Sequence, residues 1–481
     1  MEWFSAPDYW ISRFVVQRGM ALVYLIAFAV ALNQFRPLLG ERGLLPVPQF
    51  LRATTFRHAP SLFHIRYSDR MLALVAWTGI VLATCELLAL PERAPLAVSM
   101  LVWFVLWLLY LSVVNVGQVF YGFGWESLLL EAGFLVIFLG SFDTAPQVTM
   151  MWLLRWLLFR LEFGAGLIKL RGDLCWRTLT CLDYHHETQP MPNPLSRYFH
   201  LLPKPVHRVE VLGNFFAQLV APFALFTPQP VAGVAAAVMI ATQLWLVLSG
   251  NFSWLNLITI VLGFAAISDT WLRWIVPLTA PPQAGAPLWF VAVVLTVTAL
   301  VAVLSWWPVR NMASRRQYMN ASFNSLHLVN TYGAFGSVTR VRNEVVVEGT
   351  SDATLTRSTE WKEYEFKGKP TDPRCLPRQV APYHLRLDWL MWFAALSPAY
   401  AHGWFVPFMG KLLENDRATL ALLRRNPFPG DPPQHVRALL YRYRFATRGE
   451  HHETHAWWAR ELLGEYVRPL SLRQPGIVTA P

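Results

Sequence analysis

The sequence has few charged residues, few lysines and few cysteines, and each shortage excludes a class of protein. Charged residues make up 15% of the 481 residues, whereas soluble domains contain roughly 25%. Lysine supplies only 6 of the 41 basic residues, and basic runs of the kind that bind nucleic acid do not occur. Four cysteines are too few for a disulfide-rich scaffold. With 54% hydrophobic residues and a mean hydropathy of +0.33, the chain is predicted to be an integral membrane protein whose first partner is the lipid bilayer.

Motifs of the common enzyme classes are missing as well. The sequence contains no nucleophile elbow, P-loop, dinucleotide-binding fingerprint or kinase motif. We therefore expect no cofactor, and whether the chain is an enzyme stays open at this level. The excess of arginine over lysine, 35 against 6, indicates GC-rich coding and a bacterial source.

Apolar segments predict a polytopic α-helical bundle in the first 308 residues. A helix needs about 20 apolar residues to cross a bilayer, and segments of this order predict about nine spans. They lie at 19–32, 71–90, 96–114, 121–140, 148–170, 209–227, 231–249, 252–268 and 288–307. Residues 1–18 are aromatic and amphipathic, and we expect them to form a helix at the membrane surface. Residues 19–308 are then the membrane domain, with one long loop at 171–208.

The composition changes after Pro308. Residues 309–481 contain 23 of the basic and 15 of the acidic residues, and no apolar run among them is long enough to span a membrane. Residues 341–350 and 359–368 alternate apolar and polar side chains, which predicts strands. Residues 410–425 have helical spacing. The C-terminal region is predicted to be a soluble mixed α/β domain, with its strands first and its helices after.

The predicted spans place loop 171–208 and residues 309–481 on the same side of the membrane, because four crossings separate them. Six arginines in residues 34–70 favour the cytoplasmic side by the positive-inside rule. The cysteine pair in loop 171–208 favours the opposite side, because a disulfide persists only in an oxidising compartment. The two indications disagree about orientation.

Cys175 and Cys181 lie in the segment CWRTLTCLDYHHETQPMPNP, residues 175–194. The pair is compatible with a disulfide, with two free thiols, or with a metal site that includes His185, His186 and Glu187. Adjacent histidines do not easily reach one ion, and neither C-x2-C nor H-E-x-x-H spacing is present. We expect no metal here, and the disulfide and the free thiols remain as alternatives.

A group of charged residues interrupts the apolar segment before this loop. Arg155, Glu162 and Lys169 are spaced by two helical turns each, so they project toward one face of a helix. Charges within a membrane pair with one another or line a cavity. Arg160 belongs to the same segment, and Glu126 and Glu131 in the preceding one are plausible partners. Two interpretations follow: an ion-pair network that holds the bundle together, or a polar pocket between helices.

Several long segments carry a resemblance to a known family. Residues 152–203, with the sequence WLLFRLEFGAGLIKLRGDLCWRTLTCLDYHHETQPMPNPLSRYFHLLP, resemble the central motif of the lipase maturation factor family. Residues 124–135, 364–396 and 410–430 are similar to further segments of that family. The resemblance covers roughly residues 9–469, and its motifs are long and ordered.

The resemblance implies properties that composition does not show. Vertebrate members are multi-spanning proteins of the endoplasmic reticulum, and they are required for dimeric lipases such as lipoprotein lipase to fold and assemble. Their C-terminal domain faces the lumen, which by analogy exports residues 309–481 and loop 171–208 and favours the disulfide. In a bacterial chain the membrane would be the inner membrane. The resemblance also makes a signature loop of the residues Asp183, Tyr184, His185, His186, Glu187, Thr188, Gln189 and Pro190.

Two hypotheses of different classes follow. In the first, the chain is a membrane-anchored maturation factor that assists folding or assembly of exported client proteins such as lipases. Aromatic residues of the 361–408 region would then contact exposed apolar surface of the client. The candidates are Trp389, Trp392, Phe393 and Trp404. In the second, the chain is a membrane enzyme that acts on a lipid or peptide substrate in the charged intramembrane pocket.

Overall fold

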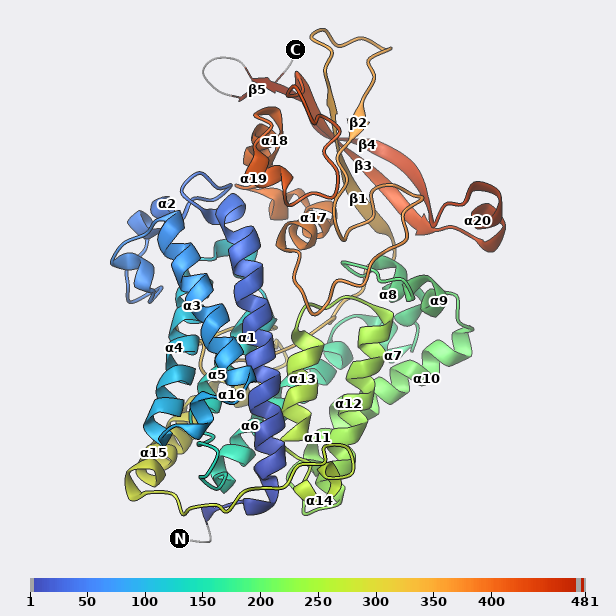
Figure 1. The fold of residues 1–481 in the computed structure, drawn as a ribbon. Helices are drawn as coiled ribbons and strands as arrows, with labels where there is room; N and C mark the ends of the chain where they lie inside the picture. Colours follow the sequence, from blue (N-terminus) through green and yellow to red (C-terminus); the bar gives the residue numbers. More distant parts are fainter. Residues whose placement is uncertain (1–3, 473–476, 480–481) are drawn as a thin grey trace.

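The computed structural model describes residues 4–472 and 477–479. Figure 1 shows a helical bundle that carries the N-terminus at one end and a smaller domain built on a sheet at the other. The main helices of the bundle are α1 (Trp10–Leu39), α3 (Asp69–Leu87), α4 (Leu96–Asn115), α5 (Gly124–Val136), α6 (Val148–Arg171), α12 (Val231–Ser249), α13 (Leu255–Phe264) and α15 (Leu288–Leu304). Shorter helices are α2 (Val47–Ala53), α7 (Leu174–Arg177), α8 (Leu182–Thr188), α9 (Ser196–His200), α10 (Lys204–Phe215), α11 (Ala221–Ala224), α14 (Asp269–Leu272) and α16 (Trp306–Ala313).

Five helices of the described residues are long and apolar enough to cross a membrane, so the expectation of about nine spans is not supported. The five are Pro7–Leu39, Asp69–Leu87, Leu96–Asn115, Val231–Ser249 and Leu288–Ala313. The other expected spans differ for separate reasons. Helices α5 and α13 are too short to cross, α6 carries several charges, and residues 209–227 are divided by a π-helical turn at Phe216–Val220.

Helix α1 is the centre of the bundle, and it runs without a break across residues 18 and 19. The separate helix expected at residues 1–18 is therefore not a separate element, because Trp10 and Ile11 are buried at the start of the same helix. Neighbouring helices approach α1 closely through glycine. A side chain at Gly79 of α3 would collide with Phe28, and one at Gly133 of α5 would collide with Tyr24. Small residues at such positions are typical of packed membrane helices.

The C-terminal domain contains one antiparallel five-stranded sheet in the order β2-β1-β3-β4-β5. The strands are β1 (Arg342–Thr350), β2 (Lys362–Glu363), β3 (His435–Phe445), β4 (Trp458–Leu472) and β5 (Ile477–Thr479). The helices are α17 (Arg386–Leu396), α18 (Phe405–Leu413), α19 (Arg417–Leu420) and α20 (Arg448–Thr454). The expected order of strands first and helices after is wrong, because β3, β4 and β5 follow α17–α19 and complete the sheet.

The bundle and the C-terminal domain share one hydrophobic core. Buried apolar side chains form a contiguous cluster that runs from the bundle helices into α17, α18 and the inner face of the sheet. A buried ion pair crosses the same boundary. Nη1 of Arg386, the first residue of α17, lies 2.8 Å from Oε1 of Glu126 in α5, and both side chains have no exposed surface. Glu126 also accepts a hydrogen bond from the Tyr110 hydroxyl.

Removing only one partner of this ion pair should lower the free energy of unfolding much more than removing both partners. Arg386→Met leaves the Glu126 carboxylate buried without its cation, and such a loss typically costs about 3–5 kcal/mol. The double variant Glu126→Gln/Arg386→Met removes both charges and should recover most of the lost stability. Chemical unfolding of the full chain in detergent micelles measures both effects.

The matched control for this experiment is Arg468→Met, whose guanidinium is 80% exposed beside Glu465. Exposed pairs of this kind add little to stability, so the control should unfold as the wild type does. Equal destabilisation by Arg386→Met and Arg468→Met would show that the buried pair does not hold the domain on the bundle.

Candidate functional site

A disulfide closes the short loop after α6, as the resemblance implied. Cys175 and Cys181 are bonded to each other, and both are buried. Asp173 precedes α7 and its Oδ1 accepts a hydrogen bond of 3.0 Å from the backbone N–H of Cys175, which starts the turn. The bond packs with Trp176, Val211 and Val338 in a small apolar cluster of its own. The loop is therefore a fixed structural unit, and the alternative of two free thiols does not apply.

Asp173 also ties this loop to the chain that enters the C-terminal domain. The guanidinium of Arg340 lies 2.8 Å and 3.0 Å from the two carboxylate oxygens of Asp173. The hydrogen bond from Arg340 lowers the pKa of Asp173 to about 2. The carboxylate thus stays ionised at any physiological pH, and the two-pronged contact keeps its geometry.

The signature loop is docked on the C-terminal domain through its backbone. The buried guanidinium of Arg342 in β1 donates hydrogen bonds to the carbonyl oxygens of Glu187, Gln189 and Pro190. In the opposite direction, the Glu187 carboxylate accepts a hydrogen bond of 2.8 Å from the backbone N–H of Phe445 in β3. These contacts join the loop directly to the C-terminal domain.

Further contacts of the loop continue this interface. The Thr188 hydroxyl donates to the carbonyl of Thr339, and the Thr188 carbonyl accepts from the indole of Trp392. The amide of Gln189 donates to Ser196 and to the carbonyl of Ser249 at the end of α12. Tyr184 lies under the guanidinium of Arg340, at 4.9 Å from its ring centroid.

The two histidines of the loop face inward and are kept neutral by burial. His185 packs edge-on against Phe335 with ring centroids 4.8 Å apart, and burial lowers its pKa to about 3. Burial also holds the pKa of His186 well below its usual range, and the neighbouring histidines add to that effect. Neither imidazole is placed as a general base that works near neutral pH.

The charged side chains of α6 make separate contacts and do not form one continuous network. Arg160 is paired with Glu131 of α5, and it donates a hydrogen bond of 2.7 Å to the carbonyl of Asn330. Glu131 also accepts from the Tyr332 hydroxyl at 2.7 Å. Arg155 does not contact Glu162, because its guanidinium donates to the carbonyl oxygens of Ala265 and Leu225 instead.

Glu162 and Lys169 are joined by an amide rather than by direct contact. The side-chain nitrogen of Gln218 donates to Glu162 at 3.0 Å, and its oxygen accepts from Lys169 at 3.0 Å. Gln243 supplies a second donor to Glu162 at 2.7 Å, and Asn214 a second acceptor to Lys169 at 2.8 Å. Both charges are therefore satisfied by neutral polar groups, which permits them to lie beside open space.

That open space is a cavity of about 1090 Å³ between the bundle, the signature loop and α17. Its wall includes polar side chains from α6, α8 and α10, among them Glu162, Lys169, His186 and Glu210. Aromatic side chains of α5, α12 and α17 also line it, among them Trp125, Trp245 and Trp389. Cavities of 300–1,000 Å³ with a mostly apolar wall and a few polar groups are typical ligand sites.

The aromatic residues expected to contact a client are not on an open surface. Trp404 has no exposed surface and Trp389 is 4% exposed. Trp389, Trp392 and Phe393 line the cavity, because α17 lies on the end of the bundle. The expectation of an exposed aromatic surface in this region is wrong for Trp389 and Trp404, whose side chains belong to the core.

Several residues that define the site were not predicted from the sequence. Arg342, Arg386 and Gln218 hold the loop, the domain and the charged pocket, and nothing in their local sequence distinguishes them from other arginines and glutamines. His207 and Glu210 had a usable signal, because they are three residues apart on α10 and therefore share a helix face.

The fold and the site define a polytopic membrane protein that encloses an interhelical cavity beneath a docked extramembrane domain. The family model for the lipase maturation factor transmembrane domain matches residues 11–274. The family model for the lipase maturation factor C-terminal domain matches residues 328–468. The chain belongs to the lipase maturation factor family. No solved structure matches it.

Individual relatives match along nearly the full chain. Lipase maturation factor 1 of Bos taurus is 43% identical over 97% of this chain and 90% of its own length. The Homo sapiens protein of the same name is 42% identical over 97% and 89%. Lipase maturation factor 2 of Xenopus laevis is 29% identical over 97% and 83%. These relatives are vertebrate proteins, and they do not support the bacterial source inferred from the arginine excess.

Replacing both bonded cysteines should loosen the loop without unfolding the bundle. The chain-entropy model assigns so short a ring about 2 kcal/mol, so Cys175→Ser/Cys181→Ser should unfold at lower denaturant than the wild type. Maleimide labelling of the denatured wild type should count two thiols before reduction and four after.

The control is Cys85→Ser/Cys375→Ser, because these two cysteines are free. It should retain the wild-type stability and show no thiol until it is reduced. Four reactive thiols in the unreduced, denatured wild type would contradict the disulfide.

Proposed function

We propose that this protein is a membrane-anchored maturation factor that assists the folding or assembly of exported lipases. The observation that carries the proposal is the 43% identity to lipase maturation factor 1 of Bos taurus over 97% of this chain. That match extends across both the membrane domain and the C-terminal domain and covers 90% of the relative's length. The name of that relative supplies the client class.

The C-terminal domain and the signature loop are proposed to face the exported side of the membrane, which in a eukaryotic cell is the lumen of the endoplasmic reticulum. The disulfide between Cys175 and Cys181 supports this orientation, because such bonds persist only in oxidising compartments. Gln34, at the end of α1, exchanges hydrogen bonds with His384 and Arg386. The arginine-rich loop 34–70 therefore begins on that same side, and in this proposal its positive charge does not set the orientation.

The client is proposed to bind the uncovered edge of β4 rather than the aromatic region. Within the described residues, β5 pairs only with Leu470–Leu472 of β4, so most of β4 is a free edge. Leu462 is 54% exposed and Leu463 is 40% exposed on this edge. An exposed edge strand with apolar side chains offers backbone hydrogen bonds and apolar contact to a partly folded chain.

Charge on this edge should reduce lipase maturation while leaving the factor folded. Leu462→Glu/Leu463→Glu places two carboxylates where the client would pair, so secreted lipase activity should fall at least fivefold. The assay is the activity of a co-expressed secreted lipase in cells that lack their own maturation factor, normalised to the amount of factor in the membrane.

The matched control is Thr354→Glu/Ser358→Glu, which adds the same charge to exposed positions of the same domain. It should leave maturation at the wild-type level. Secretion that does not depend on the wild-type factor at all would overturn the proposed function. Equal activity of the β4 variant and the wild type would overturn the assignment of the client to this strand.

A second candidate function is an enzyme that acts on a lipid or peptide substrate inside the bundle. The observation that favours it is the cavity of about 1090 Å³ with Glu162 and Lys169 on its wall. Proton transfer by Lys169 would require a primary amine at that position. A maturation factor without chemistry requires only a positive charge that satisfies Gln218 and Asn214.

Lys169→Arg separates the two candidates, because it keeps the charge and removes the amine. The first candidate predicts that lipase secretion stays within twofold of the wild type. The second, if its chemistry is what matures the lipase, predicts a loss of at least tenfold. Lys169→Met serves as the reference for loss of the charge itself. Comparable protein levels for the two variants in the membrane make the activities comparable.

A further inference from the structure

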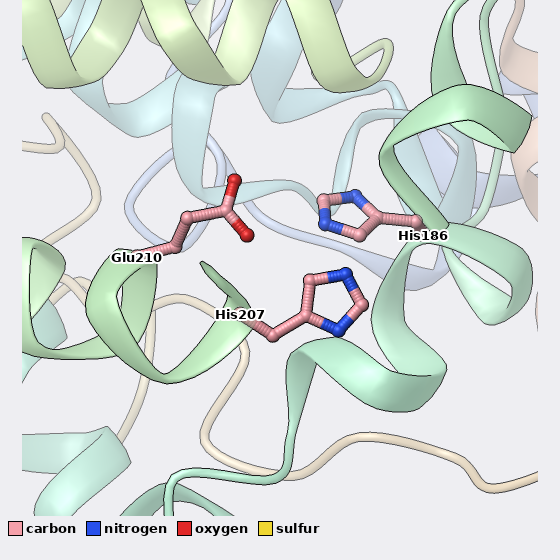
Figure 2. Close-up of side chains that lie close together, drawn as sticks. All are labelled: His186, His207 and Glu210. Carbon is pink, nitrogen blue, oxygen red and sulfur yellow. The ribbon is translucent and has the colours of Figure 1, made fainter. Parts of the chain in front are cut away.

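His186 presents an unexplained buried polar group. Its side chain is 3% exposed, and neither ring nitrogen has a hydrogen-bond partner among the described residues. A buried donor or acceptor without a hydrogen-bond partner costs about 1–3 kcal/mol, so a buried imidazole of this kind requires an explanation. Figure 2 shows that the ring points toward two side chains of α10 rather than into apolar packing.

Those two side chains are His207 and Glu210, which occupy neighbouring positions on one face of α10. One potential ligand atom from each of the three residues lies within 4.8 Å of the others. Oε1 of Glu210 accepts a hydrogen bond of 2.9 Å from Trp245, whereas its Oε2 is buried without a partner. Two imidazoles and one carboxylate thus converge from two helices, and the His186 ring and Oε2 of Glu210 have no partner there among the described residues.

We propose that His186, His207 and Glu210 bind a divalent transition-metal ion of the zinc type. Zinc is held at about 2.0–2.2 Å by imidazole nitrogen and carboxylate oxygen, and two histidines with one glutamate are a known ligand set for it. Tetrahedral ligands at that distance are about 3.3 Å apart, so small side-chain rotations close the site from its present spacing. Two nitrogen ligands disfavour magnesium and calcium, which prefer oxygen.

The imidazole of His207 is oriented by two polar contacts, as the ring of a metal-binding histidine commonly is. Its Nδ1 lies 3.0 Å from Oδ1 of Asp183, a residue of the signature loop, and its Nε2 lies 2.9 Å from the carbonyl oxygen of Phe199. With Nδ1–H donating to Asp183, Nε2 carries the electron pair that an ion requires. Because Nε2 faces the Phe199 carbonyl oxygen, metal binding requires the imidazole to turn Nε2 away from that oxygen and toward His186 and Glu210.

Charge balance favours the same assignment. A dication together with the Glu210 and Asp183 carboxylates is neutral, which suits a site that is largely removed from water. His186 and Glu210 both line the large cavity, so a fourth coordination position is open toward it. The ion would join α8 of the signature loop to α10.

The test is the metal content of the full chain, purified in detergent through a tag that contains no histidine. The protein is stripped with chelator, incubated with excess zinc, dialysed and measured by mass spectrometry of the metal. Wild type should retain about one zinc per chain. Glu210→Gln and His186→Asn should each retain at least tenfold less, and Asp183→Asn should weaken zinc affinity by about 10–100-fold.

The control is His200→Asn, which removes a nearby histidine of α9 that is outside the group of three, and it should retain one zinc. Replacement by cobalt gives an independent readout, because a four-coordinate site produces visible absorption that Glu210→Gln should abolish. If His186→Asn does not fold, Glu210→Gln decides alone, since Glu210 lies at the cavity wall and the change is isosteric.

Less than 0.1 zinc per folded wild-type chain would overturn the proposal and would leave His207 as a polar contact between Asp183 and the Phe199 carbonyl. Retention of zinc by both Glu210→Gln and His186→Asn would overturn it as well, by placing the metal elsewhere. The proposal does not rest on lipase maturation, and its readout is metal content, so the two are tested separately.

Discussion

The buried pair of Glu126 and Arg386 is the contact on which the arrangement of the two halves depends. An isolated charge inside an apolar core is costly, and Glu126 and Arg386 compensate each other's charge in a place where neither has exposed surface. Helix α17 therefore lies on the end of the bundle in one position. That position in turn makes Trp389, Trp392 and Phe393 part of the cavity wall. The cavity exists because the domain is docked, and it is not a property of the membrane helices alone.

Arg342 likewise uses a buried charge to join the C-terminal domain to the loop after α6. Its guanidinium has no exposed surface, and it is neutralised by Glu344 of its own strand while it binds carbonyl groups of the signature loop. Backbone carbonyls at the end of a short helix are groups that need donors. One side chain of the sheet supplies them, so the loop takes its shape from the domain as well as from its disulfide. The short bridge between Cys175 and Cys181 fixes the start of the loop, and Arg342 fixes its end.

The sequence was sufficient for the class of protein and, through the family resemblance, for the disulfide between Cys175 and Cys181. It also located the charged residues of α6. It was not sufficient for their partners. Helical periodicity places Arg155, Glu162 and Lys169 on one face, but the groups that satisfy them, Gln218 and the carbonyls of Leu225 and Ala265, come from other helices. The number of spans was overestimated because apolar content alone does not distinguish a short buried helix such as α13 from one that crosses. Strands β3 and β4 lacked the regular alternation that identifies a half-buried strand, since burial along β4 is irregular.

The pairing of Glu126 with Arg386 joins positions that are 260 residues apart. During synthesis α5 is complete long before α17 exists, so the carboxylate of Glu126 enters the bundle without its cation. Until the C-terminal third of the chain has been made, that carboxylate must take up a proton or keep water beside it. The membrane half of the protein thus reaches its final electrostatic state only when the extramembrane half has been made. This single ion pair therefore imposes an order on the assembly of the two halves.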